Sequence, residues 1–148
     1  LRICREKGVE CALHTFVGVA NKVGADAIHL PLSSFLALSK EDKKRFARIG
    51  VSCHSLDDAL RAQNNGCDYV TLGHIFATDC KKGLPGRGLT FLSEICRRAQ
   101  VPVYAIGGIS KENLARVRDA GAQGACIMSG WMTCNDAGKY LEELRNAL

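Results

Sequence analysis

Short apolar runs recur along the chain and predict buried β-strands. They occupy residues 11–13, 27–30, 49–53, 69–73, 103–106 and 124–128. Most runs are continuously apolar rather than alternating, which is typical of strands covered on both faces in a parallel sheet. Between these runs, apolar positions follow a helical period instead. The pattern therefore predicts about six strands that alternate with helices.

Polar residues at helix starts support the predicted helices. Ser39 and Ser55 each begin a stretch with a carboxylate three positions later, which resembles a capping box. Ser110 is expected to cap a helix that starts at Lys111. The last helix is expected over about residues 136–148, where apolar residues at helical spacing bury one face against the sheet.

Three predicted helices end in a glycine that is followed by a strand. Gly24, Gly66 and Gly121 occupy this position, where a left-handed backbone conformation ends a helix. Strand starts recur at roughly 21-residue intervals, the length of a short βα unit. Consecutive βα units form either a barrel or a doubly wound sheet. No composition break divides the chain, so we expect one domain over residues 1–148.

Two features favour the barrel over the doubly wound sheet. Glycine-rich turns follow the last two predicted strands, and polar residues gather just after strand ends. In (β/α)₈ barrels, catalytic groups project from the carboxyl ends of the strands, and phosphate often binds after strands 7 and 8. The chain has 148 residues, whereas a complete barrel usually needs about 200–250.

Composition narrows the function classes. The net charge of +5 is scattered and fits a small anionic ligand. Only 6% of the residues are aromatic, which argues against a nucleic-acid stacking platform. No apolar run approaches the ~20 residues that cross a membrane. The eight cysteines contain no C-x-x-C pair, so we interpret them as small buried residues of a cytoplasmic protein. Cys80 is the exception, because it lies in a loop beside lysines whose charge favours the thiolate form.

The two glycine-rich turns are candidate phosphate sites. Gly107 and Gly108 separate a predicted strand from a helix start, and Ser129 and Gly130 repeat this arrangement after the next strand. Glycine lets the backbone approach an anion, and a helix start presents free N–H groups. Two such turns on adjacent strands predict phosphate binding by analogy with the barrel phosphate site.

A histidine at a strand end is the candidate catalytic group. His74 directly follows the run 69–73 and precedes a long loop that contains Lys81 and Arg87. Histidine is a good general acid and base at neutral pH, and the basic loop suggests a lid over an anion. Ser52 is a further candidate lining residue.

The other histidines do not predict a metal site. His14, His29 and His54 also lie near strand ends, but they are dispersed and no carboxylate cluster accompanies them. We therefore expect no metal and no other cofactor.

These stretches together resemble the thiamine phosphate synthase superfamily, a set of (β/α)₈ barrels. The resemblance covers about residue 10 to the end of the chain and rests on residues 51–55, 69–83, 105–109 and 128–130. Within it, the run from Gly73 to Gly88 is similar to the thiazole tautomerase (TenI) branch, whereas synthases typically carry proline at the position of His74. The resemblance implies an isomerase of thiamine biosynthesis that aromatises a carboxylated thiazole phosphate, with His74 moving the proton.

Two alternatives remain open beside the isomerase. Synthases join a thiazole phosphate to a pyrimidine pyrophosphate and hold Mg²⁺ through carboxylates in two motifs. Those motifs align here with residues 14–16 and 29–34, where both carboxylates are absent; this disfavours synthase activity. Residues 30–35 follow a pattern of the tautomerase branch, although the Asn-Gly-Arg that this branch often keeps is missing. The second alternative is a non-catalytic protein that binds a phosphorylated ligand.

The resemblance also changes how the length is interpreted. The motifs match the third to eighth strands of the family, so the chain is expected to be a barrel truncated at its N-terminus to about six βα units. Such a barrel leaves two strand edges exposed, and a second copy of the chain is one way to cover them. The expected partner is a phosphorylated thiazole, and neither nucleic acid nor a membrane is expected.

Overall fold

A single parallel sheet forms the centre of the molecule. The computed structural model describes all of residues 1–148, and its six strands are paired in sequence order from β1 to β6. The strands are β1 (Ala12–His14), β2 (Ala27–Pro31), β3 (Arg48–Cys53), β4 (Tyr69–Gly73), β5 (Val103–Ile106) and β6 (Gly124–Cys126). All five pairings are parallel, so every strand ends at the same side of the sheet.

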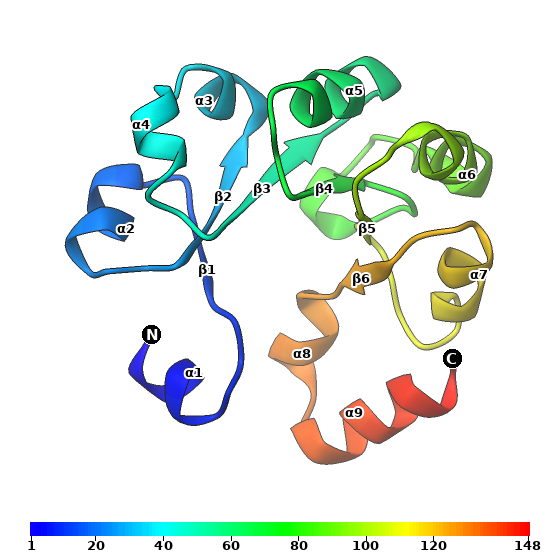
Figure 1. Cartoon of the computed structure of the whole chain (residues 1–148). Helices are drawn as coiled ribbons and strands as arrows, with labels where there is room; N and C mark the ends of the chain where they lie inside the picture. Colours follow the sequence, from blue (N-terminus) through cyan, green and yellow to red (C-terminus); the bar gives the residue numbers. More distant parts are fainter.

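Helices connect the strands and flank the sheet. They are α1 (Arg2–Glu6), α2 (Val17–Lys22), α3 (Leu32–Leu36), α4 (Lys40–Lys43), α5 (Leu56–Asn64), α6 (Gly88–Arg98), α7 (Leu114–Asp119), α8 (Ser129–Thr133) and α9 (Ala137–Asn146), with a 3₁₀ turn η1 (Asp79–Lys81) after β4. Figure 1 shows the strands near the centre with α2 to α7 around the outside.

The sheet curls into part of a barrel and does not close. β1 and β6 each pair with one neighbour, so each leaves one edge unpaired. In Figure 1, α1 lies at one end of the curve and α8 and α9 lie at the other. The structure thus confirms a parallel α/β fold with a curled six-stranded sheet.

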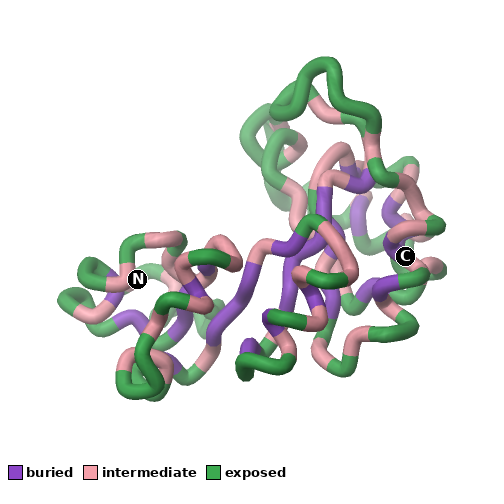
Figure 2. The backbone as a smooth tube through the Cα atoms, turned by 90° about the horizontal axis from the view of Figure 1, so that it is seen from above, coloured by how far each residue is buried: buried purple, intermediate pink, exposed green.

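Apolar side chains of the central strands form the core. Ile28, Val51, Val70 and Leu72 are completely buried, together with Ala105 of β5. Figure 2 shows that burial concentrates along the strands, while the connecting loops are exposed. Burial of such side chains from water is the main term that stabilises the sheet and its helices.

The structure confirms most of the predicted helix signals and corrects one. The Ser39 and Ser55 hydroxyls accept the N–H groups of Asp42 and Asp58, respectively. The prediction for Ser110 is wrong, because α7 begins only at Leu114 with Asn113 as its N-cap residue. The Asn113 side chain instead accepts the Ser110 N–H at 3.0 Å and donates to the Gly108 carbonyl at 2.9 Å. These hydrogen bonds hold residues 110–113 in a turn, so the loop after β5 is longer than the sequence predicted.

The cysteine interpretation holds only in part. Cys53 and Cys67 are buried, but five cysteines are half-buried and Cys80 is exposed. Burial raises the pKa of the Cys53 thiol to about 12 and that of Cys67 to about 11. These two thiols are therefore protonated at neutral pH and act as small apolar side chains.

None of the helices is long and apolar enough to span a membrane.

Candidate functional site

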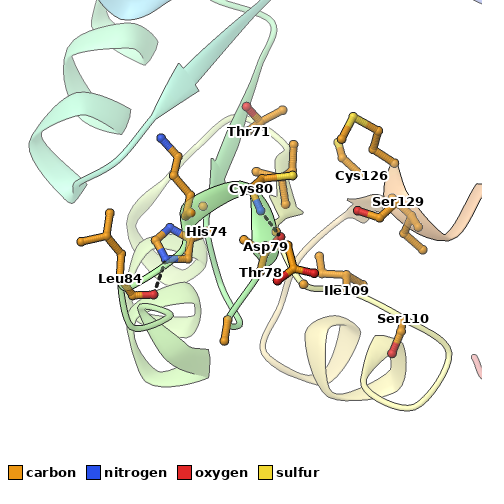
Figure 3. A pocket seen from close by; sticks show the side chains of 18 of the residues that line it. Thr71, His74, Thr78, Asp79, Cys80, Leu84, Ile109, Ser110, Cys126 and Ser129 are labelled. Carbon is orange, nitrogen blue, oxygen red and sulfur yellow. Dashed lines mark hydrogen bonds between the residues drawn. The ribbon is translucent and has the colours of Figure 1, made fainter. Parts of the chain in front are cut away.

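A pocket opens at the carboxyl ends of β3, β4, β5 and β6. Its volume is about 890 Å³, and residues that follow each of these strands line it. The polar lining side chains are Ser52, His54, Thr71, His74, Thr78, Asp79, Lys81, Lys82, Ser110, Ser129 and Tyr140. Figure 3 shows several of them around the cavity. The position is the one at which barrel enzymes place their active sites.

Unpaired backbone N–H groups line the pocket after β5. The N–H groups of Gly107, Gly108 and Ile109 donate to no acceptor in the protein, and all three residues line the cavity. Both glycines have positive φ, +96° and +65°. Successive N–H groups in such a turn form a concave anion-binding surface. The predicted phosphate turn therefore has the local geometry that binding an anion requires.

The second glycine turn lies beside the first. Ser129 and Gly130 begin α8 and line the same pocket, and the N–H groups of Ile127 and Met128 just before them have no acceptor. β5 and β6 pair directly, with Ile106 opposite Cys126. The sequence-predicted residues Gly107, Gly108, Ser129 and Gly130 are thus brought together.

Close contacts fix the shape of the first turn. A Cβ added at Gly107 would overlap the Cβ of His74, and one at Gly108 would overlap the Ala77 carbonyl oxygen. The Phe76 N–H also donates to the Gly107 carbonyl at 3.0 Å. The chain after β4 therefore lies directly against the turn after β5, and only glycine fits at these two positions.

His74 joins β4 to the long loop over the pocket. Its Nε2–H donates to the Leu84 carbonyl at 3.4 Å, as Figure 3 shows. A carbonyl accepts only, so this contact leaves Nδ1 as the unprotonated nitrogen of the neutral ring. Thr78 begins η1 by accepting the N–H of Cys80 at 3.4 Å. His74 thus holds the far end of the loop near the pocket.

The loop supplies positive charge, but not from every predicted residue. Lys81 and Lys82 line the pocket and form no ion pair with a carboxylate of the chain. Arg87 lies outside the lining, and its guanidinium sits 5.1 Å from the centre of the Phe91 ring. The structure thus brings Lys81 to the site and does not bring Arg87.

Ser52 connects the pocket to a half-buried histidine. Its hydroxyl lies 2.9 Å from Nε2 of His29, and the Thr71 hydroxyl lies 3.2 Å from the same nitrogen. The Tyr69 hydroxyl lies 3.2 Å from Nδ1. Burial lowers the pKa of the His29 imidazole to about 4, and the charge of the nearby His14 adds to the effect. His29 is therefore neutral at pH 7 and both its nitrogens are occupied.

The lining does not fit an oxygen-ligated Mg²⁺ ion. Asp79 is the only carboxylate among the lining residues, and no three His, Cys, Asp or Glu side chains are grouped as metal ligands would be. Mg²⁺ in proteins is held by carboxylates and waters in octahedral geometry. Where the synthase motifs would place carboxylates, the chain has Thr15 and Ser34.

Several lining residues were missed by the sequence reasoning. His54 was not selected, although its place directly after β3 is a usable signal. Thr71, in the middle of β4, was not selected either. Tyr140 comes from α9, far along the chain, and its hydroxyl lies against Gly130. No local pattern in the sequence indicates such a contact.

Comparison with known proteins identifies relatives along nearly the whole chain. The family described as thiamine monophosphate synthase matches residues 1–131. A thiamine-phosphate synthase of Synechococcus sp. (strain CC9311) is 39% identical over 81% of this chain and 34% of its own length. That of Pyrococcus furiosus is 38% identical over 87% of this chain and 62% of its own length. The chain thus spans about a third to two thirds of these relatives.

Solved structures agree with the sequence comparison. A thiamine phosphate pyrophosphorylase from Pyrococcus furiosus superposes with a TM-score of 0.83 at 33% identity, covering 99% of this chain and 70% of that one. A structure titled native KDPGal has a TM-score of 0.69 at 18% identity, which supports the fold alone.

The comparisons correct the expected isomerase. The relatives and the 33%-identical structure are named as synthases or a pyrophosphorylase, so the prediction of a thiazole tautomerase is wrong. That prediction weighted one loop, from Gly73 to Gly88, above the rest of the chain. The synthase relatives match 81% of the chain or more.

Proposed function

Because the chain belongs to the thiamine monophosphate synthase family, we propose that it takes part in forming thiamine phosphate from a phosphorylated thiazole and a pyrimidine pyrophosphate. The observation that carries the proposal is the row of unpaired N–H groups on Gly107, Gly108 and Ile109 in the pocket. These groups suit the phosphate of the thiazole, because aligned N–H donors bind anions without a side-chain charge.

The charge distribution supports a ligand with a second anionic group. The two glycine turns supply neutral donors after β5 and β6, whereas Lys81 and Lys82 supply full charges from the loop after β4. Charge-assisted hydrogen bonds to phosphate oxygens are roughly twice as strong as neutral ones. We assign the glycine turns, with Ser129 and Gly130, to the thiazole phosphate and the two lysines to the pyrophosphate.

The transfer itself needs little acid–base chemistry. The thiazole ring nitrogen attacks the methylene carbon of the pyrimidine pyrophosphate, so a C–N bond forms while the C–O bond to pyrophosphate breaks. The electron pair leaves with the pyrophosphate, whose growing negative charge the Lys81 and Lys82 ammonium groups stabilise. The attacking nitrogen carries no proton, and His74 therefore serves as a ligand contact and loop anchor rather than as a proton shuttle. Ser52 orients the ligand from β3.

The lining favours a second candidate function as well. Asp79 alone cannot form a magnesium cage of the usual kind, so no step is assigned to a metal. A protein that binds a phosphorylated thiazole or thiamine phosphate without turnover requires only the glycine turns and the loop. This candidate rests on the absence of both motif carboxylates, whose positions are occupied by Thr15 and Ser34.

We further propose that two more parallel strands complete the barrel between β6 and β1. Both edges are unpaired, and large apolar side chains near them are exposed: Phe16 by 69% and Met132 by 80%. Unpaired edges and apolar patches are normally covered by further chain. The 33%-identical structure is longer, because this chain covers 70% of it. The alternative is that a second copy of the chain covers the two unpaired strand edges.

One assay with two readouts tests these functions. The chain is mixed with thiazole phosphate and pyrimidine pyrophosphate, with and without Mg²⁺, and thiamine phosphate is measured by chromatography. Calorimetry records the binding of thiazole phosphate in parallel. Product that depends on the chain supports the transferase, and binding without product supports the non-catalytic candidate. Absence of thiazole phosphate binding contradicts the transferase and also a non-catalytic protein that binds a phosphorylated thiazole.

A further inference from the structure

We propose that His54 accepts a hydrogen bond from the pyrimidine partner through its Nε2 atom. The proposal rests on the proposed function and names the recognition group for the second substrate. The ligand group that fits is an uncharged N–H donor, such as the exocyclic amine of an aminopyrimidine. His54 lines the pocket directly after β3.

A backbone carbonyl fixes the tautomer of His54. Its Nδ1 lies 3.1 Å from the Gly73 carbonyl oxygen at the end of β4. A carbonyl oxygen only accepts, so Nδ1 carries the hydrogen and donates it. In the neutral ring the other nitrogen then bears a lone pair. The Nε2 atom has no partner in the protein and is left to a ligand as an acceptor.

Backbone contacts hold the base of the His54 side chain. The His54 N–H donates to Asp58 Oδ2 at 2.8 Å, and the Asp58 N–H donates to the Ser55 hydroxyl at 3.0 Å. These contacts tie His54 to the first turn of α5. Together with the Gly73 contact they fix the ring from both ends, which limits the entropy lost when a ligand binds.

Neither His29 nor His74 presents an unpaired ring nitrogen at the position of His54 Nε2. Both nitrogens of His29 lie within hydrogen-bond distance of hydroxyl groups. His74 follows β4, beside the glycine turn after β5. His54 follows β3, two strands away from β5 in the sheet order. A ligand whose phosphate lies on the turns after β5 and β6 therefore meets His54 on the far side of the pocket.

The test compares two ligands on two proteins. The probes are the pyrimidine pyrophosphate with its exocyclic amine and the analogue with hydrogen in place of the amine. Calorimetry measures the affinity of each for the parent chain and for His54→Ala. We expect the parent to prefer the amine by about tenfold and the variant to bind both probes about equally, in line with one lost hydrogen bond. A structural role alone would weaken both probes by the same factor.

Further measurements separate the possible failures. His54→Gln supplies an amide donor for the Gly73 carbonyl and an acceptor for the ligand, so it is expected to restore part of the preference. Thiazole phosphate affinity, expected to change less than twofold in both variants, reports whether the site is folded. If thiazole phosphate does not bind the parent, the proposed function fails. If it binds, the role of His54 is overturned by an amine preference that survives in His54→Ala, or by a parent that does not distinguish the two probes.

Discussion

The backbone of Gly107 lies so close to His74 that a Cβ at position 107 would overlap the Cβ of the histidine. The two residues follow adjacent strands, β5 and β4, and this contact brings the loop anchor against the phosphate turn. The geometry of the turn and the position of the loop are therefore coupled at a single point. A substitution at Gly107 affects both.

Gly107→Ala is expected to lower the free energy of unfolding by about 2–4 kcal/mol, because it adds steric overlap to an unfavourable positive φ. Gly83→Ala is the matched control, since Gly83 has φ +80° but nothing within 4 Å of an added Cβ. It is expected to cost about 1 kcal/mol. Urea denaturation measures both values. Equal losses would show that the contact with His74 does not constrain the turn.

The half-buried His29 is expected to make stability depend on pH. Its pKa is lowered from 6.5 to about 4 in the folded chain, so the unfolded chain binds more protons between these values. Folding stability therefore rises with pH across this window, is fully present above about 6.5 and is lost as the pH falls towards 4. A pKa change from 6.5 to about 4 corresponds to at most about 3 kcal/mol, and about 2 kcal/mol is expected because the ring is partly exposed to solvent. It is measured as the difference in urea midpoints between the parent and His29→Gln from pH 4 to 7.

His14 and Tyr69 face the His29 ring and are present in both proteins, so the difference between parent and variant reports on the removal of the His29 ring and its contacts. A pH-independent difference in stability would contradict the neutral state assigned to the His29 ring.

Removal of a loop charge is expected to weaken anion binding. Lys81→Gln is expected to reduce the affinity for pyrophosphate by about threefold to tenfold at low salt, and by less at 0.5 M salt because the side chain is exposed. Lys22→Gln, on α2 and outside the pocket, removes the same charge elsewhere. Calorimetric titration at two salt concentrations measures both variants. Equal losses of pyrophosphate affinity in Lys81→Gln and Lys22→Gln would mean that only the net charge of the chain determines binding.

The hydrogen bond from His74 to Leu84 is expected to restrain the loop. His74→Ala removes the donor to the Leu84 carbonyl, which is expected to increase the open population of the loop about twofold to fivefold. Limited trypsin digestion after Lys81 and Lys82 measures that population. His14→Ala is the control, because the His14 ring contacts Thr15 and lies outside the pocket. Unchanged cleavage in His74→Ala would exclude the restraint.

Periodicity predicted the elements of this fold well because each one is specified locally. The runs 69–73 and 103–106 coincide with β4 and β5, since continuous apolar stretches bounded by turns have few other ways to be buried. Gly24, Gly66 and Gly121 have the positive φ expected after a helix. The run 124–128 was predicted too long, because β6 is an edge strand that ends at Cys126 and has no outer partner to extend its pairing.

The site was predicted less completely because part of it depends on tertiary contacts. The glycine turns and His74 carry local signals and lie together as expected. Arg87 looked like a loop cation, but it is the N-cap residue of α6 and its guanidinium packs over Phe91 instead. His54 was identified as a ligand-binding group only from the structure, in which its contact with the Gly73 carbonyl fixes the tautomer of the ring. Such a contact joins residues at the ends of neighbouring strands, so the hydrophobic periodicity of the sequence does not indicate it.

Amide chemical shifts test directly whether the two glycine turns bind the phosphate of the ligand. Thiazole phosphate is titrated into the ¹⁵N-labelled chain, and the same thiazole without its phosphate serves as the control ligand. The largest phosphate-dependent shifts are expected on the N–H groups of Gly107, Gly108 and Ile109, followed by Ser129 and Gly130. Phosphate-dependent shifts confined to residues outside the pocket, or none at saturating ligand, would contradict phosphate binding by the glycine turns.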